Sequence, residues 1–223
     1  MRVVLKLGGH VAAAAAAQAL ELARAGDEVE VVVVHGAGPQ ISAELRRRWI
    51  PVEFVGGRRV TSQAALAVVR SSLVAVGSEV CAAIGPTAFP LLGDEIGLEA
   101  RPLPELGLVG EPLPCCSAAI EAGLAAARIP VVAPIAVGPL NVNADEAASA
   151  LAVGLDADRL VFVSDVPGVF LEGALAPRID AEYAEGLLDA GVFEGGIVPK
   201  LLGAVRAARL GVHASIGVTE VLA

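Results

Sequence analysis

The sequence predicts an α/β protein with an open, mainly parallel central sheet and helices on both of its faces. Strand-like and helix-like segments alternate along the 223 residues, which is the pattern of such folds. In addition, residues 31–34 and 160–163 are continuous apolar runs, as parallel strands buried on both faces require. The length suits a substantial core, and we expect a single domain over residues 1–223.

The first half of the chain divides into short elements. We expect strands at residues 2–7 and 28–34, helices at 11–25 and 39–48, a hairpin over 52–60 and a long helix from 62 into the low eighties. Pro39 suits the first turn of its helix, where a backbone N–H has no partner within the helix. Gly56 and Gly57 supply the turn of the hairpin. Glycine and proline in residues 85–114 indicate short strands and loops.

The second half continues the alternation. We expect helices at residues 118–127, 144–155, 181–190 and 198–210, and strands at 131–135, 159–163, 213–216 and the C-terminus. Ligands of open α/β sheets bind beyond the carboxyl ends of the strands. That rule selects residues 6–9, 35–39, 136–143 and 164–168 as one probable rim of a site.

Composition excludes several classes of protein. A formal net charge of −9 opposes non-specific binding of nucleic acid, which needs a basic face. No segment reads as a membrane span or a cleavable signal peptide, so we expect a cytosolic protein. The three cysteines show neither a disulfide framework nor metal-binding spacing. P-loop, protein-kinase and nucleophile-elbow motifs are absent from the sequence.

Lys6 stands inside the first apolar run, directly before a glycine pair. Burying an ammonium group is costly unless it is paired, so either a solvated edge position or a bound anion explains this lysine. Gly8 and Gly9 favour the anion, because residues without a Cβ let it approach backbone N–H groups where a strand turns into a helix. A plain strand end with a tight turn is the alternative.

A second glycine-rich turn, with Gly36, Ala37 and Gly38, follows the next strand. Two such turns side by side in the sheet suggest two anionic groups, whereas a pair of ordinary tight turns is the structural alternative. His35 is the best placed of the three histidines, but none of them forms a recognisable catalytic set.

Charged residues also mark the starts of two later helices. Asn143 and Glu146 fit an N-cap with a capping-box partner, and Asp145 falls in the first turn of the same helix. Pro199 places Lys200 near another helix start, where a cation opposes the helix dipole and fits best beside bound anions. A solvated position is the alternative for Lys200, and an exposed hairpin position is the alternative to carboxylate binding for Arg59.

Together these motifs resemble the amino acid kinase family, and within it the acetylglutamate kinases. The resemblance rests on residues 6–9, 35–41, 57–61, 141–145, 164–169 and 195–200, in this order. It implies the three-layer αβα sandwich of the family. In that fold the half up to about residue 136 would hold the acyl amino acid, and the half from about residue 137 to 223 would hold the nucleotide.

The resemblance implies transfer of the γ-phosphoryl group of MgATP to the side-chain carboxylate of N-acetyl-L-glutamate, a step of arginine biosynthesis. Lys6 and Lys200 would neutralise the transferred group, and Asp145 would orient both lysines. Gly36, Ala37, Gly38, Arg59 and Asn141 would bind the substrate, and Gly8, Gly9, Ser164, Asp165, Gly168 and Gly196 the nucleotide or its phosphates. The nucleotide phosphates would supply most of the ligands of Mg²⁺, and the protein would build no metal site of its own.

The chemistry agrees with this assignment, because a carboxylate is already a nucleophile and needs no general base. The resemblance also implies a homodimer. The arginine-inhibited members use a segment before the first strand to form hexamers, and no such segment precedes Lys6 in this sequence, so we expect no inhibition by arginine.

The sequence departs from the family pattern at three places. Ala37 stands where a glycine is common, so its methyl group is expected to crowd the acceptor carboxylate. Arg58 replaces an apolar residue and is expected to add positive charge near the amino-acid pocket. The middle section is short and lacks a familiar Asn-Lys helix motif, which leaves substrate specificity less secure than phosphoryl transfer.

Three alternatives follow. A kinase of the same fold would act on N-acetyl-aminoadipate, a carrier-linked substrate or another small acid, since one methylene discriminates weakly. A non-catalytic sensor of amino acid or nucleotide would be expected to lack a lysine or Asp145. A dinucleotide-binding dehydrogenase would need Gly-x-Gly-x-x-Gly after the first strand, and the sequence has Lys-Leu-Gly-Gly-His there.

Overall fold

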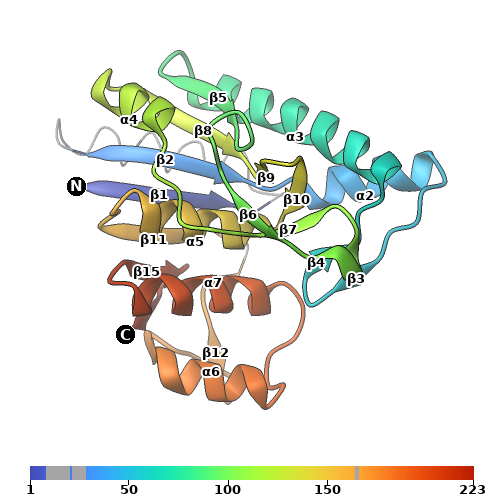
Figure 1. The fold of residues 1–223 in the computed structure, drawn as a ribbon. Coiled ribbons are helices and arrows are strands. Elements are labelled where there is room, and N and C mark those ends of the chain that lie inside the picture. The colour runs from blue at the N-terminus through green and yellow to red at the C-terminus, as the bar shows by residue number, and fades with distance from the viewer. Residues whose placement is uncertain (9–20, 22–28, 164–165) are drawn as a thin grey trace.

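The computed structural model describes residues 1–8, 21, 29–163 and 166–223 (Figure 1). The helix expected at residues 11–25 lies outside the described residues. So do the candidate phosphate-binding residues Gly9, Ser164 and Asp165.

The main sheet has eight strands in the order β14-β16-β15-β11-β1-β2-β8-β5. These are β14 (Arg178–Asp180), β16 (Thr219–Leu222), β15 (His213–Ile216), β11 (Arg159–Val163), β1 (Arg2–Leu7), β2 (Glu30–His35), β8 (Ile129–Ala133) and β5 (Ala88–Leu92). Every neighbouring pair is parallel except β15 and β16. The open, mainly parallel sheet predicted from the sequence is therefore confirmed.

Helices cover both faces of this sheet, as the layered arrangement in Figure 1 shows. They are α2 (Gly38–Arg47), α3 (Gln63–Ile84), α4 (Ala118–Ala125), α5 (Ala144–Gly154), α6 (Ala181–Asp189) and α7 (Ile197–Arg209). Side chains of a strand alternate between the two faces. Val4 accordingly packs in a core with α5 and α7, whereas Leu5 packs in a second core with α2 and α3. The result is the expected three-layer αβα sandwich.

Helix α3 begins at an N-cap serine, because Ser62 Oγ accepts a hydrogen bond of 3.2 Å from the backbone N–H of Ala65. Its length and hydropathy would suffice to cross a membrane. However, its buried residues, among them Val69, Leu73 and Val80, pack in the core over the sheet. We therefore read α3 as the core helix of a soluble fold.

Several short strands lie beside the carboxyl ends of the main sheet. A four-stranded sheet has the order β6-β7-β10-β9, and two hairpins are formed by β3 with β4 and by β12 with β13. Their bounds are β6 (Ala100–Pro102), β7 (Val109–Pro112), β10 (Leu140–Val142), β9 (Ile135–Ala136), β3 (Phe54–Val55), β4 (Arg58–Arg59), β12 (Phe170–Leu171) and β13 (Ala174–Leu175), with a 3₁₀ turn at Pro104–Leu106. Gly56 and Gly57 make the turn of the first hairpin with φ of 55° and 77°, a left-handed conformation that favours glycine.

Two differences from the predicted elements have a clear cause. The strand expected at residues 131–135 is interrupted at Pro134, because proline has no N–H for the ladder, so β8 ends at Ala133 and β9 starts a different sheet. Strands β9, β10, β12, β13 and β14 were not predicted individually. Each has only two or three residues, which is too short to show a periodicity.

Candidate active site

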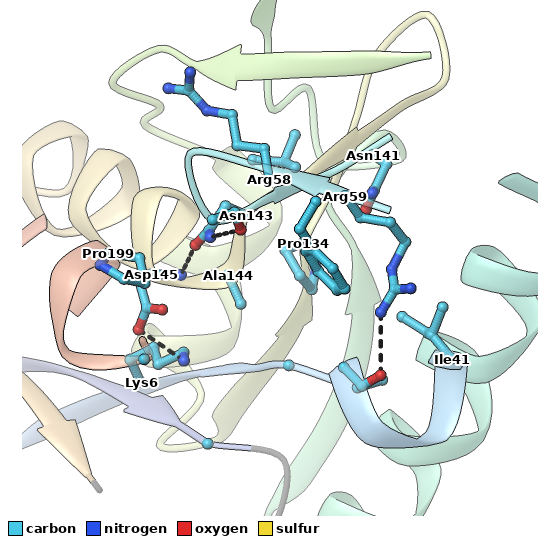
Figure 2. Close-up of a pocket in the computed structure, with 18 of the residues that line it drawn as sticks. Lys6, Ile41, Arg58, Arg59, Pro134, Asn141, Asn143, Ala144, Asp145 and Pro199 are labelled. Carbon is cyan, nitrogen blue, oxygen red and sulfur yellow. Dashed lines mark hydrogen bonds and ion pairs between the residues drawn. The ribbon is translucent and has the colours of Figure 1, made fainter. Parts of the chain in front are cut away.

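A cavity of about 390 Å³ opens at the carboxyl ends of β1 and β2. Figure 2 shows Lys6, Asp145 and Pro199 at one end and Arg59, Asn141 and Ile41 at the other. The remaining lining comes from the glycine-rich turn after β2, the β3–β4 hairpin, and the starts of α5 and α7, including Gly8, Gly36, Ala37, Gly38, Gly57, Asn143, Gly196 and Lys200. Three of the four segments of the predicted rim, 6–9, 35–39 and 136–143, thus contribute residues to this cavity, whereas Val166 and Gly168 of the fourth line an adjoining one.

Two lysines share one carboxylate at the first end of the cavity. Lys6 Nζ lies 2.7 Å from Asp145 Oδ1, and Lys200 Nζ lies 3.9 Å from the same oxygen. All three side chains are largely buried, with exposed fractions of 6%, 14% and 7% for Lys6, Lys200 and Asp145. Two ammonium groups that lie together at one end of the cavity suit an anionic ligand.

The position of Lys6 in the sheet excludes one of the two explanations considered for this lysine. Strand β1 lies between β11 and β2 in the middle of the sheet, so the solvated edge position considered for Lys6 is wrong. Lys200 is held in the first turns of α7, where its Nζ donates to the backbone oxygen of Gly196 at 3.1 Å. Its largely buried side chain likewise excludes a fully solvated position.

Asn143 fixes Asp145 at the start of α5. Its Oδ1 accepts hydrogen bonds from the backbone N–H groups of Asp145 at 2.8 Å and Glu146 at 3.3 Å, as an N-cap residue does. The predicted capping box is only half right, since the Glu146 side chain pairs with Arg58 instead of returning to the cap. The helix N-terminus adds a favourable field for anions beside Asp145.

The turn after β2 leaves open space at the cavity. A Cβ added to Gly38 would meet no atom within 4 Å, whereas one added to Gly36 would lie 3.5 Å from the Cβ of Ala144. Ala37 has a φ of −140°, which alanine adopts without strain, and its methyl group is buried in the core of α2 and α3. Ala37 also lines the first cavity, so its crowding of the acceptor carboxylate stays a prediction.

Arg59 is buried at the opposite end of the cavity. Its Nη2 donates to the backbone oxygen of Gly38 at 3.1 Å and to Ser42 Oγ at 2.8 Å, and its guanidinium lies 4.5 Å from the centroid of the Phe54 ring. The buried Nη1 has no hydrogen-bond partner in the part of the chain that the structure describes. Burial, and then the charge of Arg46, lower the pKa of Arg59.

A buried guanidinium nitrogen without a partner at the edge of a cavity fits a carboxylate ligand, since such a nitrogen is costly to leave unpaired. The exposed hairpin position considered for Arg59 is wrong. Asn141 lies nearby on β10, where its Nδ2 donates to Thr61 Oγ1 at 2.9 Å, and Thr61 Oγ1 donates to the Arg59 backbone oxygen at 2.7 Å. These bonds hold the amide of Asn141 at the cavity wall.

Arg58 does not add a free positive charge to the pocket, contrary to the expectation from the sequence. Its guanidinium binds the Glu146 carboxylate, with Nη2 to Oε1 at 2.8 Å and Nε to Oε1 at 3.0 Å, and Nη2 also lies 3.8 Å from Glu111 Oε1. These two glutamates, together with Thr61 and Ser42, are the polar residues around the site that were not assigned there from the sequence. Thr61 carried a signal as part of the motif at residues 57–61, and Glu146 was expected only as a capping-box partner.

A second cavity, of about 430 Å³, adjoins the first and shares Gly196 and Lys200 with it. Its other lining residues are Val166, Gly168, Phe170, Phe193, Glu194 and Ile197. At Gly168 a side chain is excluded by packing, because an added Cβ would lie 2.5 Å from Thr219 Oγ1. Close packing and the position at this cavity both explain why residue 168 is a glycine.

His35 does not reach the first cavity. It is buried beside Gly77 of α3 and lines a separate cavity of about 200 Å³. Burial lowers the pKa of His35 to about 4, against a smaller opposing effect of a backbone hydrogen bond at Gly36. His213 is exposed at the start of β15, and His10 lies outside the described residues.

Comparison with known proteins agrees with this geometry. The model of the amino acid kinase family matches residues 1–217. The acetylglutamate kinase of Geobacillus stearothermophilus is 38% identical over 190 residues, which cover 80% of this chain and 74% of that protein. The acetylglutamate kinase of Gluconacetobacter diazotrophicus is 39% identical over 211 residues, covering 84% of this chain and 67% of that protein.

Solved structures share the fold over nearly the whole chain. The crystal structure of smu.665 from Streptococcus mutans UA159 superposes with a TM-score of 0.88 at 28% identity, covering 99% of this chain and 98% of that one. Carbamate kinase from Giardia lamblia bound to AMP-PNP superposes with a TM-score of 0.73 at 15% identity, covering 99% and 98%. By the family match and its relatives, the chain belongs to the amino acid kinase family, whose members are ATP-dependent phosphotransferases that act on carboxylates.

Proposed function

We propose that this protein is an N-acetyl-L-glutamate kinase of arginine biosynthesis. The observation that carries the proposal is one cavity with two kinds of anion site at opposite ends. The Lys6–Asp145–Lys200 cluster suits a phosphoryl group, and the unpaired Nη1 of Arg59 suits a carboxylate. The relatives at 38% to 39% identity that are named acetylglutamate kinase favour a dicarboxylic acceptor.

The acceptor has two carboxylates and an acetamide, and the cavity offers a group for each. Arg59 binds the carboxylate next to the acetamide, and Asn141 hydrogen-bonds to the acetamide region. The side-chain carboxylate then extends toward the backbone N–H groups of Ala37 and Gly38, with Lys6 beyond them, whereas the N–H of Gly36 already donates to the backbone oxygen of Leu7 at 3.2 Å. Because the acceptor oxygen already carries charge, the site has only to bring two anions together and align them.

The residues between the two cavities fit ATP. Lys6 and Lys200 supply positive charge for phosphate oxygens at the start of α7, and the second cavity has apolar and aromatic walls from Val166, Phe170 and Phe193. We assign phosphate binding to Gly8, Gly9 and Gly196, and nucleotide contacts to Ser164, Asp165 and Gly168. When bound with the nucleotide, Mg²⁺ supplies further neutralisation of the phosphate charge.

The two halves of the chain divide these tasks. Arg59 and the turn at residues 36–38 come from the half before residue 136, whereas all described residues of the second cavity come from the half after it. We therefore assign acceptor binding mainly to the first half and nucleotide binding to the second. Asn141 is an exception, since it reaches the acceptor end from β10.

In the reaction, Lys6 and Lys200 hold negative charge on the phosphoryl group while it moves between the two anions. Asp145 keeps both ammonium groups at the same place, and the backbone N–H groups of Ala37 and Gly38 hold the attacking carboxylate in line. Removing one such preorganised charge typically costs about 10²- to 10³-fold in kcat.

The experiment is a coupled assay of ADP release with MgATP and three conditions: N-acetyl-L-glutamate, N-acetyl-L-aminoadipate and no acceptor. The proposal predicts release that depends on N-acetyl-L-glutamate and is lost in Lys200→Ala. A higher kcat/KM for the aminoadipate derivative would move the enzyme to lysine biosynthesis. Silence with every acceptor, including a carrier-linked one, would contradict a carboxylate kinase and support a non-catalytic sensor. ADP release that no acceptor increases would also contradict a carboxylate kinase, but it would indicate ATP hydrolysis and not a sensor.

We also propose a cytosolic homodimer. The edge strand β5 has a partner on only one side in the described sheet, and Val74 on the neighbouring helix α3 is 47% exposed. A second copy of the chain would cover both features. Sedimentation equilibrium at micromolar protein should give twice the chain mass, and a monomer at every concentration would contradict the dimer.

A further inference from the structure

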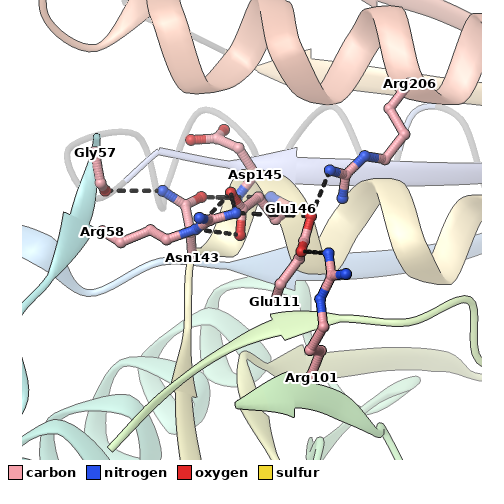
Figure 3. A network of polar contacts seen from close by, with 8 residues as sticks. All are labelled: Gly57, Arg58, Arg101, Glu111, Asn143, Asp145, Glu146 and Arg206. Atoms are coloured by element: carbon pink, nitrogen blue, oxygen red, sulfur yellow. Dashed lines mark hydrogen bonds and ion pairs between the residues drawn. The ribbon is translucent and has the colours of Figure 1, made fainter. Parts of the chain in front are cut away.

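Five charged side chains form a cluster beside the first cavity, and of these Arg58 contributes to the cavity wall. Figure 3 shows Glu111 between Arg101 and Arg206, and Arg58 against Glu146. Arg206 Nη2 lies 2.7 Å from Glu111 Oε1, and Arg101 pairs with the other oxygen of Glu111. Arg58 links the two glutamates, with its closer contacts to Glu146.

The cluster joins five elements, because its members lie on β4, α5, β6, β7 and α7. Arg58 precedes Arg59 on the β3–β4 hairpin, and Glu146 follows Asp145 on α5. Glu111 comes from β7, which pairs with the strand that carries Asn141. A further bond supports the same junction, because Asn143 Nδ2 donates to the backbone oxygen of Gly57 at 3.0 Å.

Arg58 forms its closer ion pair with Glu146, and both side chains of this pair are largely buried. The exposed fractions of the two side chains are 24% and 14%, and two guanidinium nitrogens lie within hydrogen-bonding distance of the carboxylate. Burial raises the pKa of Glu146, and the hydrogen bond and charge of Arg58 oppose that rise. An ion pair in such a place is costly to break from one side, because the remaining charge stays buried.

We propose that Arg58 and Glu146 form a positioning pair that sets the distance between Arg59, at the acceptor end of the cavity, and Asp145, at the phosphoryl end. Neither side chain is assigned a contact with substrate. The pair acts through its neighbours in the chain, since a shift of the hairpin against α5 would move Arg59 away from the acceptor. This inference rests on the proposed function.

The test compares Arg58→Leu, Glu146→Gln and the double variant Arg58→Leu/Glu146→Leu with the wild type. Each single variant should raise the KM for the acceptor about tenfold or more and lower kcat, because small misplacements of a substrate are costly. The KM for ATP should stay within about twofold, since no residue of the β3–β4 hairpin lines the second cavity. The matched control is Arg178→Leu, which breaks an exposed pair with Glu220 between β14 and β16 and should change neither KM.

The double variant separates positioning from stability. Replacing a buried ion pair by apolar side chains often restores stability, so its melting temperature should return to near the wild-type value. Its KM for the acceptor should nevertheless stay raised, because two leucines do not fix the hairpin at one distance. A double variant with wild-type KM, or single variants with equal rises in both KM values, would overturn the pair's role. A wild type inert with every acceptor would overturn the proposed function instead, and the pair's role with it.

Discussion

Lys6 Nζ lies 2.7 Å from Asp145 Oδ1, although the two residues are far apart in the sequence and come from different elements. Lys6 lies near the carboxyl end of β1, a central strand of the main sheet. The N-cap of α5 places the carboxylate of Asp145 beside it. A lysine placed there for structure alone would be balanced by one carboxylate. The second lysine, whose Nζ lies 3.9 Å from the same carboxylate, places two ammonium groups at this end of the cavity, and their convergence favours a role with anions.

Asp145→Asn should impair chemistry more than acceptor binding. The amide keeps the size of the side chain but removes the negative charge that Lys6 and Lys200 share, so the two ammonium groups lose the group that aligns them. We expect kcat to fall by about 10²- to 10³-fold while the KM for the acceptor changes little. Steady-state kinetics measure both values. Asp189→Asn, at the exposed end of α6, is the control, and an equal loss of kcat there or none at position 145 would contradict the assignment.

Arg59→Lys should weaken acceptor binding while positive charge is retained. Lysine has a single ammonium point charge and does not reproduce the planar fork of a guanidinium. We expect the KM for the acceptor to rise by about tenfold to a hundredfold, corresponding to about 1.4 to 3 kcal/mol. The KM for ATP should be unchanged. Arg159→Lys, exposed at the start of β11, serves as the control, and a rise in the KM for ATP alone would place Arg59 at the wrong end of the cavity.

Two helix caps allow a matched comparison. Asn143 caps α5 beside the site, and Ser62 caps α3 away from the Lys6–Asp145–Lys200 cluster. Substitution of either by alanine should lower the free energy of unfolding by about 1 kcal/mol. Only Asn143→Ala should also reduce kcat, since it releases Asp145 and the bond to Gly57. Urea unfolding and kinetics test both, and equal activity losses in the two variants would contradict the claim.

His35 should make the protein less stable in mild acid. Its pKa is about 4 in the folded protein and about 6.5 in an unfolded chain, so between these values the unfolded state binds more protons. The stability present above pH 6.5 is therefore lost progressively as the pH falls toward 4. From pH 7 to pH 5 this residue should lower the free energy of unfolding by about 2 kcal/mol.

His35→Leu should remove that part of the pH dependence, and urea unfolding at both pH values measures it. His213→Asn, at an exposed position, should leave the pH dependence unchanged. A wild type and a His35→Leu variant with the same loss of stability between pH 7 and pH 5 would show that His35 is not buried in its neutral form.

The sequence predicts those parts of the fold that repeat over several residues. The apolar run around Lys6 and the helix after Ser62 carry enough positions to show a period, and both were found where expected. Strands of two or three residues carry no such signal, and their pairing is decided by tertiary contacts.

The candidate site was predictable where a residue type was unusual for its local structure. Lys6 in an apolar strand and Lys200 near a helix start both conflict with local preference, and the structure brings both to Asp145. Arg58 and Glu146 show the limit of such reasoning. Each had a plausible local role, in a hairpin and in a capping box, and their partnership spans 88 positions in the chain.

The central claim is the formation of an acyl phosphate on the acceptor side chain. We would incubate the protein with MgATP, N-acetyl-L-glutamate and hydroxylamine, and measure the hydroxamate that an acyl phosphate forms. The account predicts hydroxamate that requires both substrates, with Lys6→Met reducing its rate by at least about 10²-fold. No hydroxamate from the wild type, or undiminished hydroxamate from Lys6→Met, would contradict it.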